Sequence, residues 1–165
     1  MQFKQTFDFE CSAATLMRMF GDDAYYREKY RRMATPQPEF IGMQGEGDEF
    51  SVSMRHELDT AAFKLPALAR KHLGAHVTLL QTDCWNLAAG TGHIDIATDD
   101  LPVTAALDMY IAEQENGTQL ILAFDVRAQL PVFAGKVEKA VADGLVQRMR
   151  EELVQTAQMA PAYAE

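Results

Sequence analysis

The stretch LPVFAGKVEKAVADGLVQRMREELVQT, at residues 130–156, decides the fold of this chain because it predicts one long amphipathic helix. Apolar side chains recur on it with i, i+4 spacing, in a row made of Phe133, Val137, Val141, Leu145 and Met149. Most of the charged side chains of the stretch lie on other faces. A helix with this pattern is half buried, so it must cover an apolar surface elsewhere in the protein.

A β-sheet is the predicted surface. Strand-like segments, either alternating or rich in β-branched and aromatic residues, occur at residues 1–9, on both sides of a GEGDE turn at 45–49, and at 76–85, 92–98, 103–113 and 118–128. Asn116-Gly117 predicts a type I′ turn between the last two strands.

Short helices are expected at two places between the strands. After the first strand, Ser12 can cap one helix and Asp22 or Asp23 a second, with a break at Gly21 between them. Residues 65–73 predict a further short helix before the strand at 76–85.

The dimensions of these elements require a curved sheet. The long helix would be roughly 40 Å long and about 10 Å across, whereas seven strands make a sheet roughly 34 Å wide. A flat sheet would leave much of its apolar face in water, so the sheet must curl around the helix. We therefore predict an α+β fold in which a curved antiparallel seven-stranded sheet wraps around a long C-terminal helix, with two short helices after strand one. Residues 1–165 are expected to form a single domain.

The charge and the cysteine content restrict the partners. A net charge of −9 over 165 residues opposes binding to nucleic acid, which draws on clustered Lys and Arg. The basic residues Arg27, Lys29, Arg31 and Arg32 are interleaved with acidic residues, and we interpret them as a solvated helix face. The two cysteines form no disulfide framework, and no secretory signal or membrane-spanning apolar run is evident. A cytoplasmic protein that is not integral to a membrane is predicted.

No motif for catalysis, metal or cofactor binding stands out. His72 and His76 have i, i+4 spacing, but Gly74 between them should end the helix, so a metal site is not predicted. HELDT at residues 56–60 has Thr60 where a zinc-binding motif needs its second histidine. We predict no catalytic residue and no cofactor from motifs alone.

Two segments resemble a known superfamily. FKLPALARKHLGAHVTLLQTDCW at 63–85 and LPVFAGKVEKAVADGLVQRMREE at 130–152 are similar to an uncharacterised bacterial family within the START and Bet v 1-like helix-grip (SRPBCC) superfamily, which includes polyketide cyclases and aromatases. The most specific part is formed by Pro131, Ala134, Gly135, Lys136, Val137 and Glu138. The family more often has a second glycine at the position of Ala134.

The resemblance implies an apolar cavity between helix and sheet that binds a small hydrophobic molecule, such as a lipid, a sterol-like or a polyketide-like compound. The candidate binding residues are Phe50, Met54, Trp85, Met109, Tyr110, Phe124, Val137, Val141 and Gly144. Gly144 is informative because glycine in the middle of a helix costs about 1 kcal/mol relative to alanine. It indicates either a close approach to a strand or room for a bound molecule.

Three functions remain open at this point. The preferred one is a carrier or sensor of a hydrophobic ligand. The second is a cyclase or aromatase-like enzyme in which Asp108, Tyr110 or Arg127 acts on a polyketide-type substrate. The third is an interaction module or homodimer whose cavity is filled by side chains. Five polar strand residues are candidates to line the cavity, namely Arg55, Asp95, Asp108, Tyr110 and Arg127. Sheet alternation allows them to face either way, and the interpretation that we prefer for each is the outer, solvated face.

Overall fold

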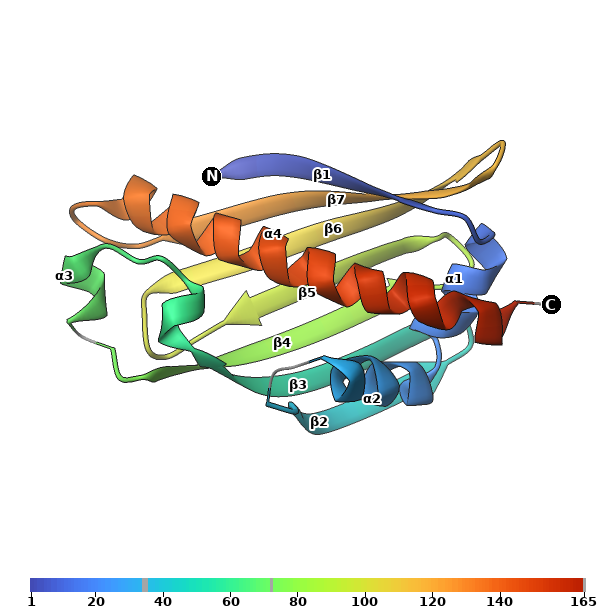
Figure 1. The fold of residues 1–165 in the computed structure, drawn as a ribbon, viewed down its shortest axis with the longest axis horizontal. Coiled ribbons are helices and arrows are strands. Elements are labelled where there is room, and N and C mark those ends of the chain that lie inside the picture. Colours follow the sequence, from blue (N-terminus) through green and yellow to red (C-terminus); the bar gives the residue numbers. More distant parts are fainter. Residues whose placement is uncertain (34–35, 72, 165) are drawn as a thin grey trace.

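The computed structural model describes residues 1–33, 36–71 and 73–164, so His72 of the proposed histidine pair lies outside the described residues. The elements are β1 (Gln2–Phe9), α1 (Ala13–Phe20), α2 (Asp23–Arg32), β2 (Glu39–Glu46), β3 (Glu49–Asp59), the 3-10 turn η1 (Thr60–Ala62), α3 (Ala67–Arg70), β4 (His76–Asn86), β5 (Thr91–Ala97), β6 (Val103–Gln114), β7 (Gly117–Ala128), α4 (Ala134–Met159) and the 3-10 turn η2 (Ala160–Tyr163) (Figure 1).

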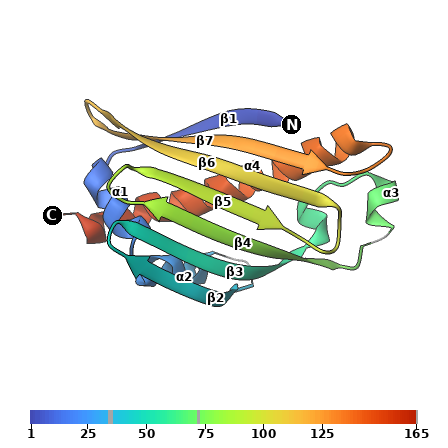
Figure 2. The same cartoon turned by 180° about the vertical axis from the view of Figure 1, so that it is seen from behind.

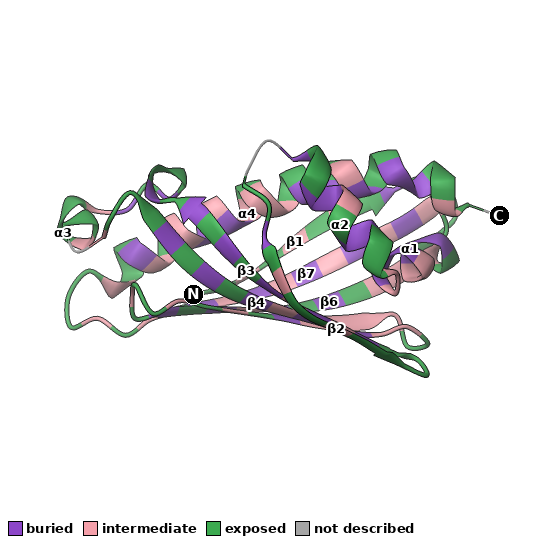
Figure 3. Cartoon of the chain, turned by 90° about the horizontal axis from the view of Figure 1, so that it is seen from below, coloured by how far each residue is buried: buried purple, intermediate pink, exposed green. Residues whose placement is uncertain are grey.

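The strands form one antiparallel seven-stranded sheet in the order β1-β7-β6-β5-β4-β3-β2. The segment holding α1 and α2 carries the chain from one edge strand, β1, to the other, β2. Figure 2 shows the uncovered back of the sheet, and Figure 3 shows that α1, α2 and α4 all lie on its concave side. The predicted α+β fold with a sheet curved around a C-terminal helix is confirmed.

The ends of the first two helices follow the predicted capping chemistry. The Thr15 backbone N–H donates to Ser12 Oγ at 3.2 Å at the start of α1, which ends before Gly21. The Ala24 backbone N–H donates to Asp22 Oδ1 at 3.2 Å at the start of α2. These local signals set the two turns that bring α2 back over the sheet.

Alternation along the strands separates two faces of the sheet. The five polar strand residues that the sequence predicts to face solvent, Arg55, Asp95, Asp108, Tyr110 and Arg127, are all exposed. On the concave face, every second residue of β3 from Phe50 to Leu58 and of β4 from Val77 to Trp85 is buried. The same alternation therefore brings His56, Gln81 and Asp83 under the helices.

The hairpin between β6 and β7 differs in detail from the prediction. Gln114 pairs with Gly117, so the turn residues are Glu115 and Asn116, and Asn116 does not adopt the positive φ that a type I′ turn requires. Gly117 has a φ of 141°. A Cβ atom there would overlap the carbonyl oxygen of Phe9. Glycine is thus needed for the close approach of the end of β1, and the turn moves back by one residue.

The start of α4 also differs from the predicted row. Phe133 precedes the helix with a left-handed φ of 61° and is 46 % exposed. Val137 and Leu145 of the row are buried, whereas Val141 and Met149 are half-buried. In the described residues, no helix combines the length and apolar character needed to span a bilayer.

Candidate ligand-binding cavity

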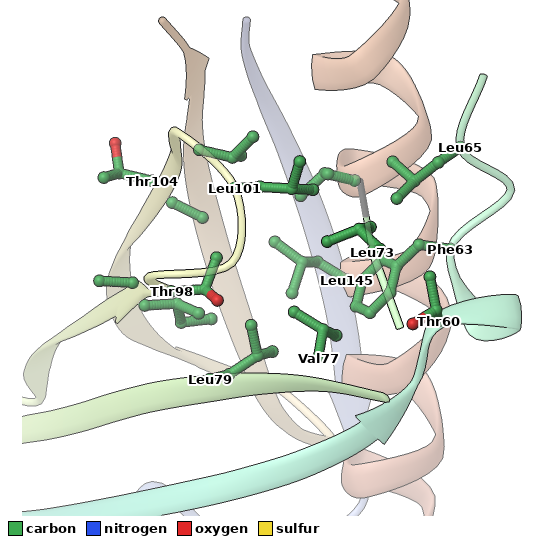
Figure 4. A pocket seen from close by; sticks show the side chains of 15 residues that line it. Thr60, Phe63, Leu65, Leu73, Val77, Leu79, Thr98, Leu101, Thr104 and Leu145 are labelled. Carbon is green, nitrogen blue, oxygen red and sulfur yellow. The ribbon is translucent and has the colours of Figure 1, made fainter. Parts of the chain in front are cut away.

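Three small cavities lie in a row between the sheet and α4. The outer cavity lies close to α3. Its volume is about 40 Å³, counted as the space that the centre of a water molecule can occupy. Figure 4 shows its lining, which is apolar except for Thr60, Thr98 and Thr104. The side chains come from the segment around α3, from β4, β5 and β6, and from α4.

The middle and inner cavities continue this path towards α2. The middle cavity, of about 10 Å³ by the same measure, shares Leu79, Ile96 and Leu145 with the outer one. The inner cavity, of about 30 Å³, shares Gln81, Met149 and Glu152 with the middle one. The three therefore adjoin and run from an apolar end to a polar end.

The size of these spaces limits what fits without rearrangement. A buried water needs about 10–15 Å³ by this measure. The cavities as they stand can hold a few waters, so a larger ligand must displace side chains.

A hydrogen-bonded row of four side chains crosses the polar end. We call Arg148, His56, Gln81 and Asp83 the polar row. Arg148 Nη2 donates to His56 Nδ1 at 3.2 Å. Because arginine can only donate, Nδ1 accepts and the ring proton sits on Nε2, which lies 3.1 Å from Gln81 Oε1. Gln81 Nε2 then donates to Asp83 Oδ1 at 2.7 Å.

Burial shifts two members of the polar row, His56 and Asp83, towards their neutral forms. Burial, together with the positive charge of Arg148, lowers the pKa of His56 to about 4. Burial raises the pKa of Asp83 to about 6, although Lys29 and the Gln81 hydrogen bond act in the opposite direction. A readily protonated carboxyl therefore lines the inner cavity, and a neutral imidazole lies behind it, in contact with the lining residue Gln81.

A buried ion pair joins α2 to α4 at the inner cavity. Lys29 Nζ lies 3.4 Å from Glu152 Oε1, and both side chains are buried. Burial opposes ionisation of Glu152, but the charges of Lys29 and Arg148 outweigh it and keep the pKa of Glu152 below its ordinary value. Burial likewise opposes the charge on Lys29, but Tyr25 and Glu152 outweigh it and raise the Lys29 pKa. Both groups are therefore charged.

The interpretation of Lys29 as part of a solvated helix face is wrong. Arg27, Arg31 and Arg32 are exposed, but Lys29 is 6 % exposed. Helical spacing places it on the same side of α2 as Tyr25, Tyr26 and Tyr30. Its ammonium group lies 4.7–5.3 Å from the centres of these three rings, which gives the buried cation additional support.

The predicted ligand-binding residues separate into three groups. Four line the cavities: Trp85 and Met109 the inner one, Phe124 the middle one and Val141 the outer one. Phe50, Met54 and Val137 are buried but line none of the three. Tyr110 is 46 % exposed on the convex face, and Gly144 lies outside the three cavities.

Gly144 has a packing role that neither sequence interpretation specified. A Cβ atom at this position would lie 2.6 Å from Cδ1 of Phe63 and 3.5 Å from the carbonyl oxygen of Ala62. The glycine therefore allows the segment after η1, and not a strand, to approach α4. Since Phe63 lines the outer cavity, its ring closes that cavity on the side of Gly144.

The sequence patterns considered above did not single out the polar residues of the site. Period-two spacing could have found His56 on the face of Phe50 and Met54, and Gln81 and Asp83 on the face of Val77 and Trp85. No comparable signal in the sequence pairs Lys29 with Glu152, because that contact depends on how α2 packs against α4.

With this geometry described, comparison with known proteins gives the family. The profile of the family described as "Protein of unknown function (DUF2505)" matches residues 4–159. The chain belongs to the DUF2505 family. A search of the curated proteins found no match.

Solved structures with a similar fold include an aromatase/cyclase, Ara h 8.0201 and a START superfamily protein. The Zhui aromatase/cyclase from Streptomyces sp. R1128 has 12% identity and a TM-score of 0.64, with 98% of this chain and 93% of that chain covered. Ara h 8.0201 has 10% identity and a TM-score of 0.65, with 98% of each chain covered. A START superfamily protein from Mycobacterium smegmatis has 12% identity and a TM-score of 0.58, with 98% of this chain and 97% of that chain covered. At these identities the likeness shows the fold alone.

Proposed function

We propose that this DUF2505 protein binds a small, mainly apolar molecule between the sheet and α4, as a carrier or sensor. The observation that carries the proposal is the row of adjoining cavities, apolar beside α3 and polar beside α2. The cavities adjoin through shared lining residues, so a ligand that displaces side chains can extend from one cavity into the next. Binding pockets are usually apolar with a few polar groups that fix orientation, and this arrangement matches that description.

The enzyme alternative loses the residues on which it was based. Asp108, Tyr110 and Arg127 are exposed on the convex face and do not converge in the cavity. The alternating neighbours Leu107, Met109 and Val126 are buried and apolar instead, and of these Leu107 lines the middle cavity and Met109 the inner one. This set of residues therefore supports no cyclase-like reaction.

The test is a matched pair of substitutions on β6. Ala105 is buried and lines the outer cavity, whereas the next residue, Ala106, faces the opposite side of the sheet. Ala105→Leu should fill the outer cavity and weaken uptake of apolar ligands. Ala106→Leu adds the same side chain to the convex face and should leave uptake unchanged.

Uptake is measured by native mass spectrometry of gently purified protein and by titration with a lipid and polyketide panel. The fluorescence of Trp85, the single tryptophan, reports on the inner cavity that it lines. Absence of any adduct, together with no saturable binding across the panel, would contradict the proposal. Equal loss of binding in the two leucine variants would also contradict it, because the loss would then not come from the cavity.

A further inference from the structure

A groove between the segment at 62–66 and the first half of α4 collects lysine side chains. Its charged lining residues are Lys64, Lys136, Lys139 and Asp143, and we call it the lysine groove. Its volume is about 840 Å³ by the measure used for the interior cavities. A small molecule therefore fits in the lysine groove without displacing side chains, in contrast to the interior cavities.

The segment at 62–66 is a thin wall between the lysine groove and the outer cavity. Phe63 and Leu65 line the outer cavity. The residues that alternate with them, Ala62, Lys64 and Pro66, line the groove. The wall thus brings Lys64 to the same groove as the lysines of α4, although about 70 residues separate them in the sequence.

The lysine groove reverses the charge balance of the chain. The whole chain has 15 basic and 24 acidic residues, whereas the described lining of the groove has three lysines and one acidic residue, Asp143. Asp143 lies 3.1 Å from Lys139 Nζ in an exposed pair. Lys64 and Lys136 have no ion-pair partner in the part of the chain that the structure describes. An anion in the groove therefore meets two unpaired cations and a third that is weakly paired.

The sequence around Lys64 adds no opposing charge. No acidic residue occurs between Asp59 and Asp83, whereas Arg70 and Lys71 follow Lys64 in this segment. Exposed charges more than about 8 Å apart are largely screened at physiological ionic strength. A small anion therefore responds to the lysines around it and not to the net charge of −9, whereas a long polyanion would extend onto the acidic remainder of the surface.

The chemistry of lysine indicates which anion fits. An ammonium group is a compact charge with three donors and no fixed plane. A carboxylate carries one charge, which one lysine balances. A phosphate group carries about −1.5 to −2 at pH 7 and has three strong acceptor oxygens, which several lysines can share. Three lysines around one groove therefore favour a phosphate group over a carboxylate.

We propose that the lysine groove binds a phosphate group, which Lys64, Lys136 and Lys139 hold between the wall and α4. The phosphate belongs either to a soluble molecule or to a phosphomonoester lipid headgroup, since both present the same chemistry. The site is separate from the interior cavities, and its occupation does not require an apolar ligand.

The soluble arm of the experiment is isothermal titration calorimetry of the full chain with pyrophosphate and with acetate, at one ionic strength. We expect saturable binding of pyrophosphate that is about tenfold or more tighter than that of acetate, because pyrophosphate carries several charges. Bound pyrophosphate should also slow amide hydrogen exchange at residues 62–66, because it links the wall to α4. Binding without slower exchange there would place the anion elsewhere and overturn the proposal.

The lipid arm is co-sedimentation with phosphatidylcholine vesicles that contain or lack phosphatidic acid, whose headgroup is a phosphomonoester. Lysine-dependent binding in either arm supports the proposal, and the arm in which it occurs identifies the source of the phosphate. Absence of lysine-dependent binding in both arms would overturn the proposal, as would equal affinity for pyrophosphate and acetate.

Substitutions in the groove provide the test of lysine dependence. Lys64→Met and Lys136→Met should each weaken binding of the phosphate probe about fivefold. Asp143→Asn should strengthen it by a similar factor, because it frees Lys139 and removes the acidic group of the groove. Lys4→Met is the matched control, since Lys4 is exposed on β1 and does not line the groove. Equal losses in Lys64→Met and Lys4→Met would indicate diffuse attraction to positive charge and overturn the site.

Discussion

Two histidines on opposite faces of the same sheet have opposite environments. His56, on the concave face of β3, is 1 % exposed, and burial beside Arg148 lowers its pKa to about 4. His93, on the convex face of β5, has a side chain that is 44% exposed. Its Nδ1 lies 2.6 Å from Asp108, and its Nε2 lies 3.1 Å from Asp95. These hydrogen bonds, Asp108 first, raise the pKa of His93.

The difference shows that titratable side chains behave differently on the two faces of one sheet. On the convex face, water stabilises the charges and ion pairs contribute little. On the concave face, each charged group loses its hydration and depends on particular neighbours. The concave face therefore carries large, specific effects of substitution and pH, and the convex face should not.

The largest effect is expected from breaking the buried ion pair. Lys29→Met leaves Glu152 buried without its nearest cation and should lower the free energy of unfolding by about 3–5 kcal/mol. The double variant Lys29→Met/Glu152→Leu should recover most of this loss, because no uncompensated charge remains. Urea unfolding at pH 7 measures both.

The convex-face control for this experiment is the exposed Arg55–Glu39 pair, at 2.8 Å. Arg55→Met should cost less than about 1 kcal/mol. A similar loss in Arg55→Met and Lys29→Met would contradict the distinction between the two faces.

Asp83 should make the protein less stable as the pH rises. Its folded-state pKa of about 6 is above the ordinary value of 3.8, so the folded protein favours the protonated carboxyl. Stability should fall as the pH rises from about 4 through 6. Asp83→Asn should remove this fall and, at pH 7, gain up to about 3 kcal/mol. Urea unfolding of both proteins between pH 4 and 7 is the measurement. If the free energy of unfolding depends on pH in the same way in Asp83→Asn and in the unsubstituted protein, Asp83 is not buried as described.

His56 should act in the opposite direction over nearly the same pH range. Its folded-state pKa of about 4 is below the ordinary value of 6.5, so stability falls as the pH drops from 6.5 through 4. The two effects partly cancel in the unsubstituted protein. In Asp83→Asn, only the loss of stability towards acid pH that His56 causes should remain. In His56→Gln, only the loss of stability towards higher pH that Asp83 causes should remain. Parallel slopes in the two variants would contradict this compensation.

The smallest effect is expected on the convex face. Asp108 accepts the hydrogen bond that contributes most to the raised pKa of His93. Asp108→Asn replaces this charged acceptor by a neutral one, so the pKa of His93 should move down towards its ordinary value. NMR titration of the His93 ring measures the shift. The free energy of unfolding should change by no more than about 0.5 kcal/mol. A larger loss would mean that this exposed cluster is structural.

Much of the site was accessible from local patterns. Period-two spacing on β3, β4 and β6 assigns Trp85, Met109 and, equally, His56 to the concave face. It also assigns Tyr110 to the convex face, although Tyr110 was included among the ligand-binding candidates. Gly144 was correctly marked as unusual, but its partner Phe63 comes from a segment about 80 residues earlier, which no local pattern indicates.

The sequence by itself determined the order of the elements, the caps of the first two helices, the alternation of faces along the strands and the need for a curved sheet, because these follow from local geometry and apolar periodicity. The tertiary structure alone decided that Lys29 meets Glu152, that Arg148 reaches His56 and that small cavities remain between the sheet and α4. Such contacts depend on the relative placement of α2, α4 and the sheet. That placement is set by the summed packing of many side chains, so no short stretch of sequence encodes it.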